Sequence, residues 1–482
     1  MTQEEELQVL REENRLLKEL VAELLPLREE VARLKEQVNE LQQRLAQDSR
    51  TSSQPPSADG LSRQPRSGRR PSGKPSGGQP GHAGRTLWMV EQPDEVERQR
   101  PEVCSACQGS LKEVPGSLVD RRQVFDLPLV RLVVREYQIE AVCCPKCHTI
   151  TQGRFPPEVA APVKSGPNVQ ALAVYLHQGQ LLPVARTCQV LTDICGCHLC
   201  EGTVVAWVEQ AGARLAPTVE HIADLIASSP LQHGDETGIR VYGMLFWLHV
   251  NCTRWLTHLS WHPSRGTEAM EEIGIWRRFT GRGVHDRWAS YDASDCAHSL
   301  CGAHLLRDCA GVAEQHEQGW AAEMHDFLLD LHAACQQWRL AGVGSVPPIE
   351  RDEWVARFFE ILAAGYAAQP PPPSRAPGKR PGRHKHSKAK NLLDALLTRA
   401  EQVLAILDDL RIPFTNNQAE RDLRMAKVQQ KIAGTFRSAT GATAFCRIRS
   451  YLAPMQKQGH PLLSALAAVF HGHPFPVAWA PE

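Results

Sequence analysis

The chain has 482 residues, of which 42% are hydrophobic and 22% charged, enough to bury a sizeable core and too many for one average domain. Lysine plus arginine and aspartate plus glutamate both number 54, so the net charge of zero hides local basic surfaces, and charge must be compared segment by segment. The sequence has no apolar run of 18 residues and no N-terminal signal core, so we expect a soluble, unexported, cytoplasmic protein with reduced thiols.

Residues 1–48 carry a heptad pattern. Apolar residues from Leu17 to Leu45 recur in alternating steps of three and four, which predicts a coiled coil. Twelve acids against seven bases make the helix acidic, so we expect it to pair two protomers and not to contact DNA. A helix packed on its own domain is the alternative. Pro26 lies inside the pattern and predicts two shorter coils or a kink.

Residues 49–86 are rich in Ser, Pro, Gly and Arg and carry seven cations against one acid, Asp59. Such a segment cannot bury enough apolar surface to fold alone, which predicts a disordered basic linker. Its cations also suit weak contact with DNA phosphates, and the two interpretations are compatible.

Two C-x-x-C pairs lie in residues 87–160, Cys104 with Cys107 and Cys144 with Cys147. The two-residue gap lets both thiolates of a pair face one tetrahedral Zn²⁺, so we predict a structural zinc knuckle, with unmetallated thiols as the alternative. Cys143 or His148 could replace one ligand. The 36 residues between the pairs contain alternating apolar runs, which predict a strand pair that brings the pairs together.

Residues 161–222 contain apolar-periodic segments separated by turns, which predict several short helices. Their lengths suit a helix-turn-helix that docks on DNA, and ordinary packing helices remain the alternative.

Two aspartates are expected to meet at one edge of a sheet. Three consecutive strands, the first containing Asp235, precede a helix over residues 267–279 and a fourth strand that ends at Asp286. Parallel neighbouring strands would place both carboxylates side by side. Two carboxylates so placed repel one another unless a divalent cation lies between them, and oxygen ligands favour Mg²⁺ or Mn²⁺.

A third acid, Glu420, lies near the start of a strong predicted helix. Asn417 is the expected N-cap, and the N-x-x-E spacing of a capping box would by itself explain the glutamate. Helical spacing supports a further role, because Glu420 shares a face with Arg424, Lys427 and Lys431. We expect this face, together with Arg421, to lie along a DNA backbone while the acidic end holds metal.

Five strings in this order resemble the transposases of the insertion sequence 66 family, of the TnpC type, and the similarity covers nearly the whole chain. These strings are GGQPGHAGRTL at 77–87, GDETG around Asp235, HDRWASYD around Asp286, CGAH at 301–304 and TNNQAERDLR around Glu420.

The resemblance implies a ribonuclease-H-like catalytic domain whose Asp, Asp, Glu triad falls on Asp235, Asp286 and Glu420. Such enzymes cut element ends and join them to target DNA by two-metal in-line displacement. Cys301 and His304 match a C-x-x-H that either orients the fold beside the site or forms a packed core pair. The string after Asp286 departs from the family pattern, so Asp292 or Asp295 could be the second acid instead.

The sequence therefore predicts a multidomain α+β transposase. After the coil, linker, zinc-binding domain and helical segment come a catalytic α/β domain at 223–450 and a helical tail at 451–482. A helical and basic Pro-rich insertion at about 310–395 interrupts the catalytic domain, and its basic run is either a disordered loop or a strap over DNA. Expected partners are double-stranded DNA at element ends and target, a second protomer and accessory transposition proteins, in the bacterial nucleoid. A DNA-binding regulatory protein without strand transfer and a stand-alone metal-dependent nuclease are the rival functions.

Overall fold

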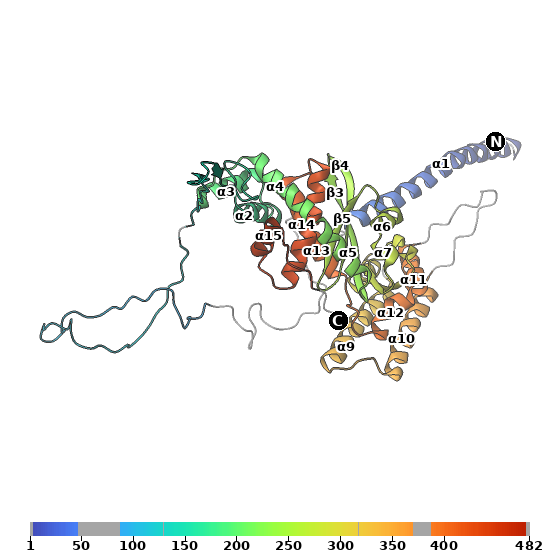
Figure 1. Ribbon diagram of the computed structural model, residues 1–482. Coiled ribbons are helices and arrows are strands. Elements are labelled where there is room, and N and C mark those ends of the chain that lie inside the picture. The colour runs from blue at the N-terminus through green and yellow to red at the C-terminus, as the bar shows by residue number, and fades with distance from the viewer. Residues whose placement is uncertain (1–2, 47–86, 129, 317, 370–386, 479–482) are drawn as a thin grey trace.

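The computed structural model describes residues 3–46, 87–128, 130–316, 318–369 and 387–478 (Figure 1). It contains both helices and sheet, which confirms the α+β class. The basic linker at 49–86 lies outside the described residues, as do positions 370–386 of the Pro-rich insertion.

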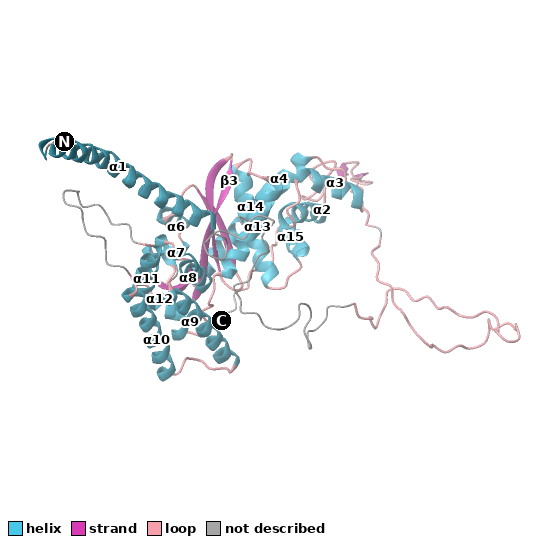
Figure 2. Ribbon diagram, turned by 180° about the vertical axis from the view of Figure 1, so that it is seen from behind, coloured by secondary structure: helices cyan, strands magenta, loops and turns pink. Residues whose placement is uncertain are grey.

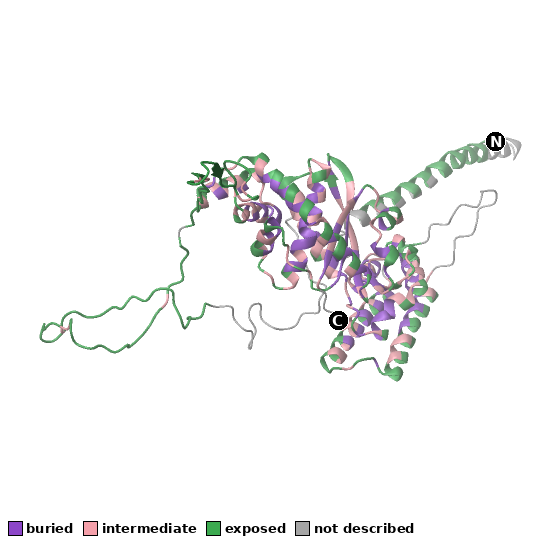
Figure 3. Cartoon of the chain, viewed as in Figure 1, coloured by how far each residue is buried: buried purple, intermediate pink, exposed green. Residues whose placement is uncertain are grey.

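Helix α1 (Gln3–Ala46) is one uninterrupted helix that includes Pro26, so the predicted break into two coils is wrong. A proline removes one backbone donor and crowds the preceding turn, which is a local cost that the flanking helix-forming residues tolerate here. The described side chains of α1 are exposed along its length, as the green colouring in Figure 3 shows.

The segment with the cysteine pairs contains one short antiparallel strand pair, β1 (Ala141–Cys143) and β2 (Ile150–Gln152). These strands flank the second cysteine pair. The predicted strand pair between the two cysteine pairs is absent from the described residues there, which form loop up to Glu140. Val119, Val124 and Val133 of this loop are almost fully exposed, so the alternating pattern finds no surface on which to bury one face.

A mixed five-stranded sheet forms the centre of the molecule (Figure 2). Its strand order is β5-β4-β3-β6-β7; β3, β4 and β5 pair antiparallel, whereas β6 and β7 run parallel to β3. The first hairpin turns at Tyr242 and Gly243, both at positive φ, as a two-residue hairpin requires. The strands are β3 (Leu231–Val241), β4 (Met244–Cys252), β5 (Thr257–His262), β6 (Arg282–His285) and β7 (Ala297–Leu300). The four strands and the helical segment predicted between them are confirmed.

Helices cover both faces of this sheet. Ile239 and Val241 of β3 pack with α13 (Asn417–Ala433) and α14 (Ala439–Lys457) on one face. Gly234, of the opposite parity along the strand, faces Trp276 on the other side, where a Cβ would approach the indole to 2.4 Å. That face carries α6 (Thr267–Ile273), α7 (Ile275–Arg278) and η3 (Ala289–Ala293).

The short helices of the predicted helical segment form one hydrophobic cluster with the C-terminal helices α14 and α15. This packing places residues 171–219 and residues 444–470 in one hydrophobic core. The elements are α2 (Pro167–Val174), η2 (Tyr175–Gly179), α3 (Val184–Cys195), α4 (Glu201–Arg214), α5 (Ala216–Ala227) and α15 (Leu462–His471).

A second large cluster holds the insertion together. Leu300, at the end of β7, and Phe414, just before α13, belong to this cluster and so connect the insertion to the sheet. Helices are present within the predicted insertion at about 310–395, and the cluster extends beyond those bounds on both sides. Its helices are α8 (Gly302–His316), α9 (Gly319–Leu340), α10 (Pro348–Ala367), α11 (Lys388–Thr398) and α12 (Ala400–Asp408).

Candidate active site

Asp235 and Asp286 lie side by side at one end of the parallel strands. Leu231 of β3 pairs with Arg282 of β6, and the register continued by four residues places Asp235 opposite Asp286. Asp286 is the first residue after β6. Because side chains alternate across a strand, Asp235 shares the sheet face of Ile239, which is covered by α13. The predicted pairing of the two strands and the position of each aspartate are confirmed.

Burial and neighbouring charge both oppose ionisation of Asp235. Burial raises its pKa well above the usual value, and the carboxylates of Glu236, Asp286 and Glu420 raise it further. A hydrogen bond from the Glu236 backbone N–H, at 2.9 Å, opposes this only in part. Charge repulsion of this kind is what a bound divalent cation relieves, so this donor set fits Mg²⁺ or Mn²⁺.

More groups stabilise the ionised form of Asp286 than of Asp235. Burial and the Glu236 charge raise the pKa of Asp286, whereas the Trp288 backbone N–H, which donates at 2.8 Å, and two arginines lower it. The other two acids that the sequence left open lie elsewhere: Asp292 forms an ion pair with Arg399, and Asp295 is exposed between η3 and β7. The geometry therefore favours Asp286 as the partner of Asp235.

Glu420 lies in the first turn of α13, which is anchored to the sheet by Asn416. Asn416 is the N-cap, so the prediction that Asn417 caps the helix is wrong; Asn417 is the first helical residue. The Asn416 side chain donates to Gly234 O at 2.8 Å and accepts from His233 Nδ1 at 2.9 Å. Because the cap lies one residue earlier than expected, Glu420 is not placed to complete a capping box.

Cys301, His304 and Glu420 form a compact group. Their donor atoms all lie within 4.8 Å of one another, and no other three His, Cys, Asp or Glu side chains among the described residues meet this criterion. Cys301 Sγ also accepts the Asn416 backbone N–H at 3.1 Å. Burial lowers the pKa of His304 to about 3, so its imidazole is neutral and able to bind a metal. The family resemblance placed Cys301 and His304 either beside the site or in a packed core pair, and it did not show that they lie near Glu420.

The opposite face of β3 carries Glu236, which flanks Asp235 in the sequence, and its partner Arg265, which the sequence analysis missed. Glu236 is 2% exposed at its side chain and accepts from Arg265 at 2.7 Å and from the Tyr291 hydroxyl at 2.7 Å. The Arg265 guanidinium stacks on Trp288, 3.8 Å from its ring centroid. No local pattern in the sequence marks Arg265, because its partners Glu236 and Trp288 come from two other segments of the chain.

The predicted basic stripe lies along α13. Arg421, Arg424, Lys427 and Lys431 are all exposed. Lys427 differs from the others, since its Nζ donates to Gly238 O at 2.8 Å. Arg307 lies 3.9 Å from Glu420 and adds a further cation at the start of the helix.

The two cysteine pairs have matching backbone turns. Cys104 N donates to Gly109 O and Gln108 N to Cys104 O, and the same two bonds recur from Cys144 N to Thr149 O and from His148 N to Cys144 O. The residue after each pair, Gln108 or His148, has positive φ. The two pairs therefore share the same local backbone conformation. The two halves do not share one compact donor group in this structure.

A comparison of the sequence with known protein families identifies the family of this chain. Residues 163–444, more than half of the chain, match the family described as Transposase IS66 family. The chain belongs to the IS66 family of transposases.

All three predicted acids of this transposase lie within the matched region, and its family assigns it a DNA-processing role and suggests use of a divalent metal. Residues 2–87 match a second family, DUF6444, whose function is unknown. No curated protein matches the chain. None of the helices in the described part of the chain is long and apolar enough to cross a membrane.

Proposed function

We propose that the protein is a DDE transposase in which Asp235, Asp286 and Glu420 bind Mg²⁺ or Mn²⁺ during cleavage of element ends and their joining to target DNA. The observation that carries this proposal is the parallel register that sets Asp235 beside Asp286 on the sheet face covered by the helix of Glu420. The mixed sheet, with three antiparallel strands followed by two parallel ones, supports the ribonuclease-H-like assignment.

The protein's own groups have separable roles in this proposal. Asp235 and Asp286 bind the cation, and the buried hydrogen bonds of Asn416 hold Glu420's helix against the same strand. Bound divalent ions would activate a water or a 3′ hydroxyl and stabilise the leaving oxygen. Arg421, Arg424 and Lys431 are exposed on the same helix, where they would contact DNA phosphates.

A strand-transfer assay with Mg²⁺ and DNA that carries the element ends tests the proposal. We expect Asp286→Asn to abolish nicking and joining, because the variant removes one ligand charge beside Asp235. Asp292→Asn is the matched control: it neutralises a nearby aspartate that pairs with Arg399 instead.

The assay also separates the rival functions. Activity that survives in Asp286→Asn but is lost in Asp292→Asn would contradict the assignment of the second acid. Nicking without joined products in the wild type would indicate a nuclease, and end binding without nicking would indicate a regulatory protein.

Zinc binding by Cys104, Cys107, Cys144 and Cys147 is part of the same proposal. The matching turns support it, and a closed site requires the two pairs to come together. Purified full-length protein should contain about one zinc per chain by elemental analysis. Cys104→Ser should lose that zinc, whereas Cys335→Ser, a buried cysteine of the helical insertion, should retain it.

A further inference from the structure

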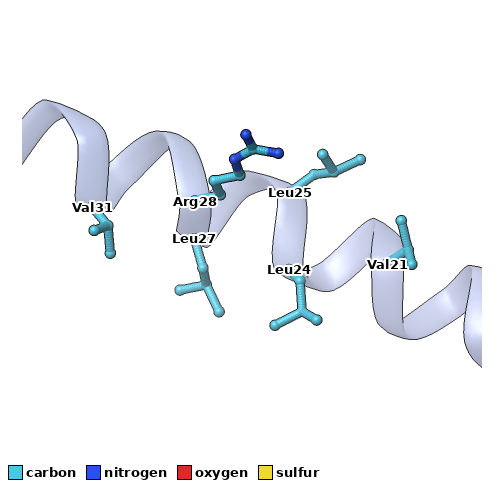
Figure 4. Close-up of a pocket in the computed structure, with 6 residues that line it drawn as sticks. All are labelled: Val21, Leu24, Leu25, Leu27, Arg28 and Val31. Carbon is cyan, nitrogen blue, oxygen red and sulfur yellow. The ribbon is translucent and has the colours of Figure 1, made fainter.

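The exposed seam of α1 points to a specific partner. The seam residues Leu17, Leu20, Leu24, Leu27, Val31, Leu34, Val38 and Leu41 are each 47–60% exposed, so no described part of the chain buries them. A continuous apolar stripe of this length marks an interaction surface. Figure 4 shows Leu24, Leu27 and Val31 pointing to one side of the helix, with Leu25 and Arg28 pointing to the other.

The seam fixes the heptad positions. With Leu17, Leu24, Val31 and Val38 at position a, leucines occupy every d position from Leu20 to Leu41. At Val31 and Val38 the a residue is β-branched, and valine at a with leucine at d favours two parallel strands over higher oligomers. Pro26 then falls at an outer c position, so its ring lies away from the seam.

The flanking positions determine the orientation. In a parallel in-register dimer, each g residue faces the e residue five positions later in the partner helix. The four such pairs are Leu16 with Val21, Glu23 with Arg28, Glu30 with Lys35, and Gln37 with Gln42. Two pairs join opposite charges, one is apolar and one joins two amides, so all four are complementary.

The charges at the same e and g positions disfavour an antiparallel arrangement. It places g opposite g and e opposite e, so with the whole seam overlapped Glu30 would face Glu30 and Arg28 would face Arg28 of the partner helix, and no pair would join opposite charges. Glu30 contacts Arg33 of its own helix at 2.5 Å, but that arginine lies at an outer c position and leaves the e–g pairing unchanged.

We propose that α1 binds α1 of a second copy of this chain as a parallel, in-register, two-stranded coiled coil. Both chains then leave the coil at the same end, after Ala46. This inference does not depend on the catalytic assignment.

Light scattering of the full-length protein measures the number of chains. Each chain is 53.6 kDa, and we expect twice that mass at micromolar concentration. Leu24→Asp should weaken the dimer about 100-fold or more, because it buries two carboxylates in the seam. Leu25→Asp is the matched control: Leu25 is next in sequence and 53% exposed, against 51% for Leu24, but lies off the seam. A monomeric wild type, or equal effects of the two variants, would overturn the proposal.

Two further measurements test the orientation. Glu23→Lys with Glu30→Lys should weaken the dimer, and adding Arg28→Glu and Lys35→Glu should restore it. A photoreactive benzoylphenylalanine at Val21, in dimers mixed from isotopically light and heavy chains, should crosslink to partner residues 16–24. Crosslinks to the partner's residues 34–42 would show an antiparallel coil and overturn the proposal.

Discussion

Asp235 and Glu236 are neighbours in sequence, yet they face opposite sides of the central strand in contrasting surroundings. Glu236 has partners within the protein, the Arg265 guanidinium and the Tyr291 hydroxyl. Asp235 has three carboxylates as its main charged neighbours, and they raise its pKa. An acid with protein partners is part of the scaffold, whereas an acid left among other acids needs a cation from outside. The environment of each carboxylate, and not its sequence position, therefore separates the two roles.

The largest expected contrast is in activity. Asp235→Asn should reduce strand transfer by a factor on the order of 10³ or more, because it removes a carboxylate that we propose binds the metal. Glu236→Gln should keep the rate within about tenfold, because Glu236 lies on the other face of the sheet. Rates of joined-product formation in Mg²⁺ measure both. Equal losses of rate in the two variants would contradict the different roles of the two sheet faces.

In metal-free buffer, the two variants should change the stability of the protein in opposite directions. Glu236→Gln should lower the free energy of unfolding by about 2 kcal/mol, because Arg265 loses its charged partner. Asp235→Asn should raise the stability, since it removes a charge that the fold disfavours. Denaturant unfolding in EDTA measures both changes, and a destabilised Asp235→Asn would contradict the repulsion described here.

Some features of the site could be predicted from the sequence, and others could not. The strands and the two aspartates could be predicted because alternating apolar patterns are local signals. Arg265 could not be, because its role depends on Glu236, Trp288 and Tyr291, which only the fold brings together. The helix cap was misplaced by one residue because Asn416 and Asn417 are chemically identical, and only contacts with His233 and Gly234 select the first.

The pH dependence of stability tests the same repulsion more finely. The pKa of Asp235 lies above its ordinary value in the folded state, so its ionisation opposes folding, and the penalty grows as pH rises from the ordinary value through the raised one. In EDTA, the stability difference between Asp235→Asn and wild type should therefore increase with pH over this window and then level off. A difference that shrinks as pH rises would show the opposite shift.

The smallest expected effect concerns the cations of α13. Arg424→Ala should lower the slope of log affinity against log salt concentration by about one. Lys427→Ala should change it less, because Lys427 Nζ is already bonded to Gly238 O. Filter binding of duplex DNA at several salt concentrations distinguishes the two; equal slope changes would mean that Lys427 leaves the sheet to contact DNA.

Calorimetric titration of metal-free protein with Mn²⁺ tests the central claim most directly. The account predicts that wild type and Asp292→Asn bind with similar affinity, and that Asp235→Asn and Asp286→Asn each weaken binding at least about tenfold. Cys301→Ser serves as the comparison for the neighbouring Cys301, His304 and Glu420 group. Unchanged binding in both aspartate variants, with binding lost only in Cys301→Ser, would contradict the account.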